Sequence, residues 1–195
     1  MILPAIPEFV TGLTLNQGEL VDVVYEPSDT SWRWNEYQSR LGQLRQLRGH
    51  VAAAARLGVF RLEGEDALQV ARQMQLAKGL DPTMALYAAY AYNSLQRNEL
   101  VREMQNYLLD DLQIRLFDIA LLAGTLDGQS ASKAEKVFPA MPMLSQGWAL
   151  LNAHGVILPP MLNSLPRFLE SSLWTLFAAP AVDLLKSALV AQEIR

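Results

Sequence analysis

The sequence contains no cysteine, and this absence excludes several kinds of chemistry at once. Without thiols the chain has no disulfide, no thiolate metal ligand and no cysteine nucleophile, and a reducing, cytoplasmic compartment is the expected location. Histidine is also scarce: His50 and His154 are the two present. Two histidines are too few for a three-histidine zinc site, and neither belongs to an H-E-x-x-H or H-x-E motif. We interpret both as capping or surface residues, and we expect no metal and no cofactor.

Charged residues are few, at 18% of the chain against 51% hydrophobic residues. This composition excludes a disordered chain, which needs low hydrophobicity and high net charge. The net charge of −4 makes nucleic acid an unexpected partner. The uncharged run from Val137 to Pro166 contains five prolines, and each proline inside a helix costs ~3 kcal/mol or more. We therefore predict no membrane span, and the proline-containing start "MILPAIPEF" is not expected to be a signal peptide.

Compact catalytic motifs are missing as well. The chain has no G-x-S-x-G, no G-x-x-x-x-G-K-[ST] and no G-x-G-x-x-G. The enzymatic option that remains is a dispersed set of carboxylates, Asp110, Asp111 and Asp118. Asp111 and Asp118 would share a helical face if the helix were continuous, but we predict a break near Gln113. Paired acids at a helix junction more often form a solvated turn or a cap than an acid–base pair.

The pattern predicts a mainly-α, compact domain of seven to eight helices with an N-terminal β-hairpin. Alternating apolar residues predict the hairpin over residues 9–26, with Asn16-Gln17-Gly18 as a three-residue loop. Three- and four-residue spacing then predicts helices. They cover residues 32–57, 65–78, 82–97, 98–111 and 114–124, then shorter pieces around 143–153 and 161–177, and a terminal helix from 180 onward. We expect residues 1–31 to form a hairpin arm packed on the helices and residues 32–195 a single helical domain. The polar loop 124–136 is expected to divide that domain into two sub-bundles.

The most distinctive stretch is Leu80–Leu100, "LDPTMALYAAYAYNSLQRNEL". Its tyrosines have two interpretations: Tyr87 and Tyr90 could line a ligand or peptide groove together with Trp148, or they could pack inside a helical bundle. The alanines between them let a neighbouring helix approach closely, and no residue nearby offers a base, a metal ligand or a phosphate cradle. We favour packing.

Residues 82–108, "PTMALYAAYAYNSLQRNELVREMQNYL", resemble a degenerate tetratricopeptide-type helical hairpin. Tyr92 stands at the place of the repeat's tyrosine, with two alanines before it, and "LQRNE" resembles the usual turn. Gln96 stands where that family commonly has glycine, and no second copy follows at a 34-residue period. The resemblance implies a helical scaffold that holds peptides or proteins. In addition, "LYAAYAY" followed by "LFDIALLAG" is similar to helical segments of bacterial proteins associated with caspase-like peptidases.

Charge is unevenly distributed near the N-terminus. Residues 1–32 contain five acids and no Lys or Arg, whereas residues 33–61 contain six arginines against one acid. The acidic hairpin could pair internally with the basic helix, or the arginines could face a protein partner, with nucleic acid as a weaker option. "WRW" could likewise be an exposed anchor for a partner, although packing between hairpin and helices is favoured. The candidate partner-binding residues are Trp32, Arg33, Trp34, Arg40, Arg45 and Arg48.

These observations lead to one main functional hypothesis. The chain is expected to be a non-catalytic protein–protein interaction module, acting as an adaptor, inhibitor or regulatory subunit, in the bacterial protease or defence setting that the resemblance implies. The polar loop could also be a cleavage site, at Asp127 for an aspartate-directed protease or at Lys133 or Lys136 for a basic-directed one. The alternatives are a hydrolase or transferase that uses the dispersed carboxylates, and a small-ligand-binding helical domain.

Overall fold

The computed structural model describes residues 1–56, 58–126 and 137–192, and the chain divides into two units. The first, which we call the hairpin unit, comprises Ala5–Arg56 and Phe60–Gln113; the second, the C-terminal unit, comprises Met1–Pro4, Leu57–Val59 and Ile114–Arg195. Helices and an N-terminal antiparallel hairpin make up the regular structure, which confirms the mainly-α prediction. The boundary between the units follows Gln113, ahead of the polar segment 124–136 where we expected the helical region to divide.

The hairpin consists of β1 (Phe9–Asn16) and β2 (Glu19–Pro27). Asn16 pairs with Glu19, so the loop has two residues rather than the predicted three. Gln17 and Gly18 both have positive φ, at 51° and 87°, as a type I′ turn requires. This turn type is favoured in two-residue hairpin loops because its twist matches that of the flanking strands. The register then shifts between Thr14 and Leu15. This β-bulge interrupts the alternation from which the strand was predicted.

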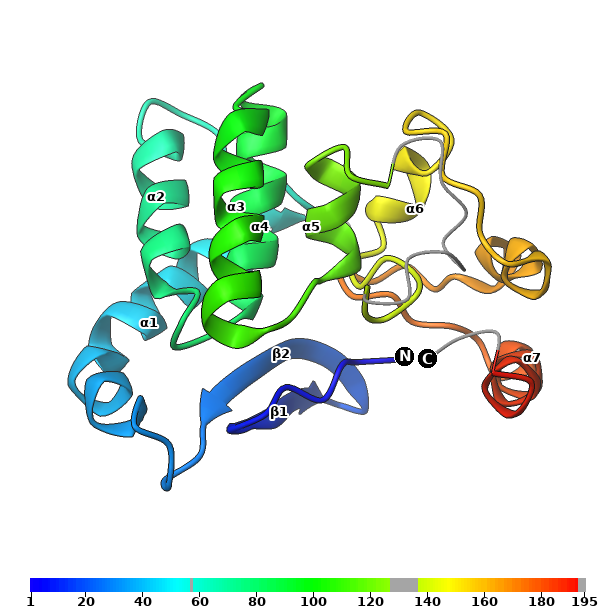
Figure 1. Ribbon diagram of the computed structural model, residues 1–195, viewed down its shortest axis with the longest axis horizontal. Coiled ribbons are helices and arrows are strands. Elements are labelled where there is room, and N and C mark those ends of the chain that lie inside the picture. The colour runs from blue at the N-terminus through cyan, green and yellow to red at the C-terminus, as the bar shows by residue number, and fades with distance from the viewer. Residues whose placement is uncertain (57, 127–136, 193–195) are drawn as a thin grey trace. The chain divides into compact units, whose positions relative to one another are not determined.

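Four helices complete the hairpin unit: α1 (Trp34–Ala54), α2 (Ala67–Ala77), α3 (Thr83–Ser94) and α4 (Asn98–Leu112). Helices α1, α2 and α3 each lie within a predicted helical range and are shorter than it by a few residues, whereas α4 begins at the predicted residue and ends one residue beyond the predicted end. Helix α3 packs against α2 on one side and α4 on another, and β2 contacts both α1 and α3 (Figure 1). Two short strands, β3 (Ala55–Arg56) and β4 (Val59–Phe60), pair with each other and were not predicted.

Helix α3 is buried on all sides. Every residue from Thr83 to Tyr92 is buried, and its small alanines allow α2 and α4 to approach. Pro82 is the N-cap residue, and the Asp81 carboxylate just before it accepts a hydrogen bond from the Thr83 N–H at 3.0 Å. The tyrosine-rich stretch therefore supplies the interior of the hairpin unit.

The turn between α3 and α4 uses a left-handed residue, Gln96, with φ of 57°. Gln96 stands where the tetratricopeptide repeat commonly has glycine, the residue that adopts this conformation without steric cost. This agreement concerns a single turn, and the resemblance stays a prediction. Helix α4 ends at a second left-handed residue, Gln113, at the predicted break.

The C-terminal unit contains α5 (Phe117–Leu122), α6 (Gly147–Leu150), the 3₁₀ helix η2 (Pro160–Phe168) and α7 (Pro180–Val190). Its apolar core draws on all four. The helix expected over residues 161–177 ends at 168, because the chain beyond it pairs with distant backbone instead. The Thr175 N–H donates to the carbonyl of Met143 at 2.8 Å, and Leu169 forms an antiparallel bridge with Phe177.

Candidate interaction site

Arg33 is the best-anchored charged residue at the start of α1. Its guanidinium lies 3.1 Å from Glu8 Oε2 and 2.9 Å from Asp111 Oδ1, and it also donates to the Asp111 carbonyl at 3.3 Å. The residue is 5% exposed. Its charge is therefore compensated inside the hairpin unit, as the internal-pairing interpretation predicted, and it is not available as a free cation for a partner.

Trp32 lies on the outer side of the same guanidinium. The Arg33 guanidinium carbon is 4.2 Å from the centroid of a Trp32 ring, within the range of a cation–π contact. Nevertheless Trp32 is 69% exposed. The arrangement supports one face of the indole and leaves the rest of a large apolar side chain in water. Such a preordered aromatic group loses little conformational freedom on binding.

The other candidate partner-binding residues differ in their surroundings. Trp34 is half-buried and stacks on Tyr37 with ring centroids 5.8 Å apart. Arg40 pairs with Glu36 one helical turn earlier, at 3.0 Å, whereas Arg45 is exposed. The structure thus brings together Trp32 and Arg33 and leaves Arg40 and Arg45 elsewhere on the surface of α1.

Arg48 belongs to a second internal cluster, built around the fully buried carboxylate of Asp81. Asp81 Oδ1 accepts hydrogen bonds from the Thr83 hydroxyl at 2.7 Å and from the Tyr25 backbone N–H at 3.3 Å, while Oδ2 lies 3.0 Å from the Arg48 guanidinium. Arg48 also lies 3.8 Å from Glu26. This carboxylate therefore joins the hairpin, α1 and the start of α3.

Asp22 adds a third carboxyl group to this cluster. It is half-buried on β2, and its Oδ1 accepts the N–H of Val23 at 2.9 Å. Burial and the nearby charge of Asp81 raise the pKa of Asp22 to about 6, against the opposing effect of Arg48. Burial also raises the pKa of Asp81, although Arg48 and the donors from Thr83 favour its charged form. One guanidinium thus faces three carboxyl groups, an imbalance that no sequence pattern indicated.

The three aromatic residues of the predicted ligand groove belong to two different units. Tyr87 and Tyr90 are buried on α3, where the Tyr87 ring lies 5.1 Å from that of Phe60. Trp148 belongs to the C-terminal unit, and its indole N–H donates to the Thr175 hydroxyl at 3.0 Å. Each of these side chains contributes to the packing of its own unit.

The dispersed carboxylates are also divided between the two units. Asp110 is exposed, and Asp111 is held by Arg33 in the hairpin unit. Asp118 is buried in the C-terminal unit, where its two oxygens accept the backbone N–H groups of Met143 at 2.7 Å and Leu144 at 3.1 Å. These contacts are those of structural carboxylates that satisfy buried donors.

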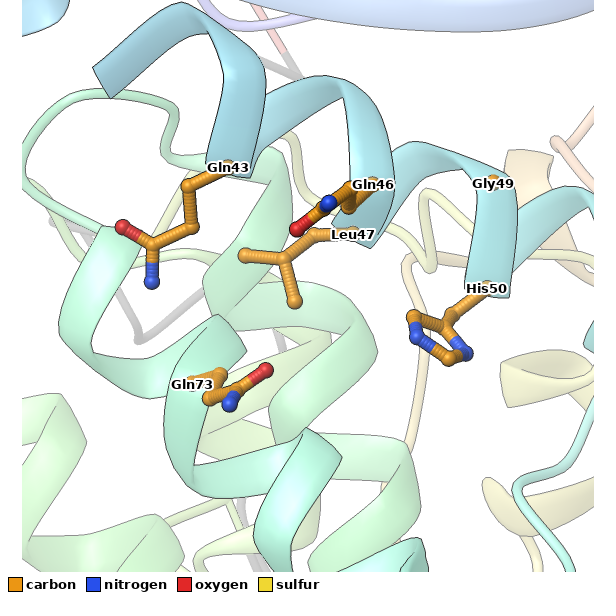
Figure 2. A pocket seen from close by; sticks show the side chains of 6 residues that line it. All are labelled: Gln43, Gln46, Leu47, Gly49, His50 and Gln73. Carbon is orange, nitrogen blue, oxygen red and sulfur yellow. The ribbon is translucent and has the colours of Figure 1, made fainter. Parts of the chain in front are cut away.

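A shallow hollow of about 550 Å³ lies between α1 and α2 (Figure 2). Its lining is mostly amide side chains, with one imidazole: Gln43, Gln46, Leu47, Gly49, His50 and Gln73. The volume is within the range of small-molecule sites, which cover ~300–1,000 Å³, but those sites are mostly apolar and enclosed. Hydrogen bonding to a polar surface group is the chemistry that this lining offers. The sequence did not predict this hollow, because its glutamines come from two helices, α1 and α2.

Within residues 1–56, 58–126 and 137–192, no group of three or more His, Asp or Glu side chains could hold a metal ion. No helix in those ranges combines the length and apolar character needed to cross a membrane. The possible cleavage positions Asp127, Lys133 and Lys136 lie outside the described residues. Comparisons with protein-family models, with curated proteins and with solved structures gave no match for this chain.

Proposed function

We propose that this chain is a non-catalytic protein–protein interaction module, which acts as an adaptor, inhibitor or regulatory subunit. The observation that carries the proposal is the exposed Trp32 held on the buried Arg33. Tryptophan is enriched among the residues that dominate binding energy at protein interfaces. Trp32 leaves a large apolar side chain in water, and burying it in a complex would contribute favourable free energy.

The electrostatics of the site support the same proposal. Arg33 is held by Glu8 and Asp111, so its guanidinium serves to orient the indole rather than to contact a partner directly. The docking surface is therefore apolar at its centre. We expect the partner to provide a pocket for the indole, with polar groups around its rim.

The alternatives are less well supported. An acid–base mechanism gains no support from Asp111 or Asp118, because each of these carboxylates satisfies donors within its own unit. A small-ligand function would rest on the open hollow beside Gln73 rather than on the predicted tyrosines. A bacterial protease or defence partner, a cleavage site within residues 127–136 and a cytoplasmic location stay predictions of the sequence.

The test is affinity capture from the source cell at low salt with the wild-type chain and two variants. Trp32→Ala removes the proposed anchor, and Leu76→Ala removes an apolar side chain of similar exposure, 68% against 69%. We expect a stoichiometric protein to bind the wild type and Leu76→Ala, and to be lost with Trp32→Ala by a factor of about 30 or more in affinity.

Both variants should keep the wild-type melting temperature, because neither side chain is buried. A partner that binds Trp32→Ala as tightly as the wild type would rule out this anchor. Repeated failure to capture any partner would count against the interaction module itself.

A further inference from the structure

The two edges of the hairpin can be distinguished by the direction of their backbone groups. The Ser28 N–H donates to the Glu8 carbonyl at 2.7 Å, so Glu8 and Ser28 form a hydrogen-bonded pair. The next pair along the strands is Phe9 with Pro27, followed by Val10 with Glu26. In antiparallel strands, hydrogen-bonded pairs alternate with pairs whose backbone groups point away from each other. From Phe9 to Thr14, the even-numbered residues of β1 therefore bond to β2, and the odd-numbered residues direct their N–H and C=O groups to the outer edges.

The outer edge of β2 is closed. The outward N–H of Val23 donates to Asp22 Oδ1 at 2.9 Å, and that of Tyr25 donates to Asp81 Oδ1 at 3.3 Å. The next outward position is Pro27, which has no N–H. This edge offers no free donor at those three positions to an additional strand.

The outer edge of β1 is open. The Phe9 N–H bonds to the Ile6 carbonyl at 3.1 Å, but Thr11 and Leu13 have no outward backbone partner among the residues that the structure describes. Along the same strand Leu13 is 52% and Leu15 62% exposed. Natural edge strands are usually protected by charges, prolines or bulges, yet β1 has no charged residue and no proline, and the extra residue of the bulge is on β2.

We propose that β1 pairs edge to edge with β1 of a second copy of this chain, in antiparallel orientation around a two-fold axis. The result is a four-stranded sheet in the order β2-β1-β1-β2. The inference concerns self-association and does not depend on Trp32 or on the proposed function.

The absence of charge on β1 favours a second copy over a charged foreign strand. No residue from Phe9 to Asn16 is charged, so antiparallel pairing of two β1 strands creates no like-charge pair in any register. The strand also offers no carboxylate to attract a basic partner strand, because Glu19, Asp22 and Glu26 are on β2 and Glu8 is paired with Arg33. A neutral strand with exposed leucines is complementary to itself.

Symmetry narrows the register. A two-fold axis perpendicular to the sheet places residues of the same face opposite each other, and the open positions are the odd-numbered ones. In the two registers that place Leu13 opposite a residue with an open backbone N–H, Leu13 lies opposite Leu13 or Thr11 of the second copy. In both registers Leu13 is at the centre of the interface, and its side chain becomes covered.

Sedimentation velocity of the full chain, from low to high micromolar concentration, tests the proposal. We expect a monomer–dimer equilibrium with a dissociation constant on the order of micromolar, since a strand-pairing interface is small. Leu13→Lys places a charge at the centre in both copies and should weaken the dimer at least about tenfold. Leu13→Pro should do the same, because it removes an N–H that faces outward and leaves the bonds to β2 in place. The matched control is Leu76→Lys on α2, which should dimerise as the wild type does.

The melting temperature of each variant shows whether the hairpin unit still folds. A wild-type chain that is monomeric at every concentration would overturn the proposal, whatever the variants do. A dimer that persists in a folded Leu13→Lys or Leu13→Pro variant would also overturn it. The same holds if Leu76→Lys abolishes the dimer while the two Leu13 variants still dimerise. Concentration-dependent protection of the Thr11 and Leu13 amides from hydrogen exchange, with no such change on β2, would support it directly.

Discussion

Asp22 gives the hairpin unit a stability that depends on pH, and a single substitution isolates the effect. Asp22→Asn replaces a carboxyl group with a neutral group of the same shape, whose amide oxygen can still accept the Val23 N–H. The charged groups that act on this position are Asp81 and Arg48, and Arg48 in turn has Glu26 and Tyr37 beside it. Removing the negative charge should relieve the imbalance between one guanidinium and three carboxyl groups.

The sign follows from the direction of the shift. Burial and the charge of Asp81 raise the pKa of Asp22 from 3.8 to about 6, so the folded state binds this proton more tightly than the unfolded state. The stabilisation is complete below the unfolded pKa and is lost as the pH rises through the folded pKa. Wild type should therefore lose stability relative to Asp22→Asn between acid and neutral pH.

The magnitude can be worked from the same shift. A shift of about two units corresponds to about 3 kcal/mol over the whole titration, and about half of that is developed at pH ~5. Screening of this half-exposed group reduces the expected effect to about 1 kcal/mol between pH ~5 and pH ~8. The free energy of unfolding of Asp22→Asn minus that of the wild type should therefore be about 1 kcal/mol larger at pH ~8 than at pH ~5.

Urea unfolding at a series of pH values, followed by circular dichroism, measures this difference. Asp29→Asn is the matched control, because Asp29 is an exposed acid in the segment between the hairpin and α1. The difference between the effects of the two substitutions isolates the contribution of the Asp22 carboxyl group. If the difference between wild type and Asp22→Asn does not change with pH, the carboxyl group is not in the environment described here.

Two further predictions concern the cores. Asp118→Ala should destabilise the C-terminal unit by about 2–4 kcal/mol, because two buried backbone N–H groups lose their acceptor, and urea unfolding measures it; a change below about 0.5 kcal/mol would mean that water replaces the carboxylate. Met74→Ala should cost about 2–5 kcal/mol through the cavity left between α2 and α3, whereas Leu76→Ala on the exposed side of α2 should lie within about 0.5 kcal/mol of wild type. Equal losses at positions 74 and 76 in thermal unfolding would show that the burial pattern of α2 is wrong.

Much of the secondary structure could be predicted because its causes are local. Gln17-Gly18 indicated a hairpin turn, the apolar spacing after residue 82 indicated α3, and the break near Gln113 indicated the end of α4. The predicted loop is one residue longer than the observed one, because Asn16 is as compatible with a turn as with the last strand pair before the turn. The helix over residues 161–177 was overextended, because the apolar spacing fits a helix while the backbone bonds of Thr175 go to Met143, far away in sequence.

The candidate site was less accessible to sequence analysis, because its contacts are not local. The acidic start and basic α1 suggested internal pairing, but Arg33 reaches an acid 78 residues away and Arg48 one 33 residues away. No spacing in the sequence connects those partners. The raised pKa of Asp22 depends in part on Asp81, 59 residues away, and could not be predicted from the sequence for the same reason. The open edge of β1 depends on which strand pairs are hydrogen-bonded, and this too is known only from the structure.

The all-round burial of α3 also constrains how the hairpin unit comes apart. A helix with no water-facing side cannot unravel by fraying while its neighbours stay in place, because α2 and α4 would have to separate first. The amides between Met84 and Tyr92 should accordingly exchange with solvent through global opening alone. Their exchange rates, measured residue by residue, would converge on a single free energy, and that value is the cooperative stability of the unit itself.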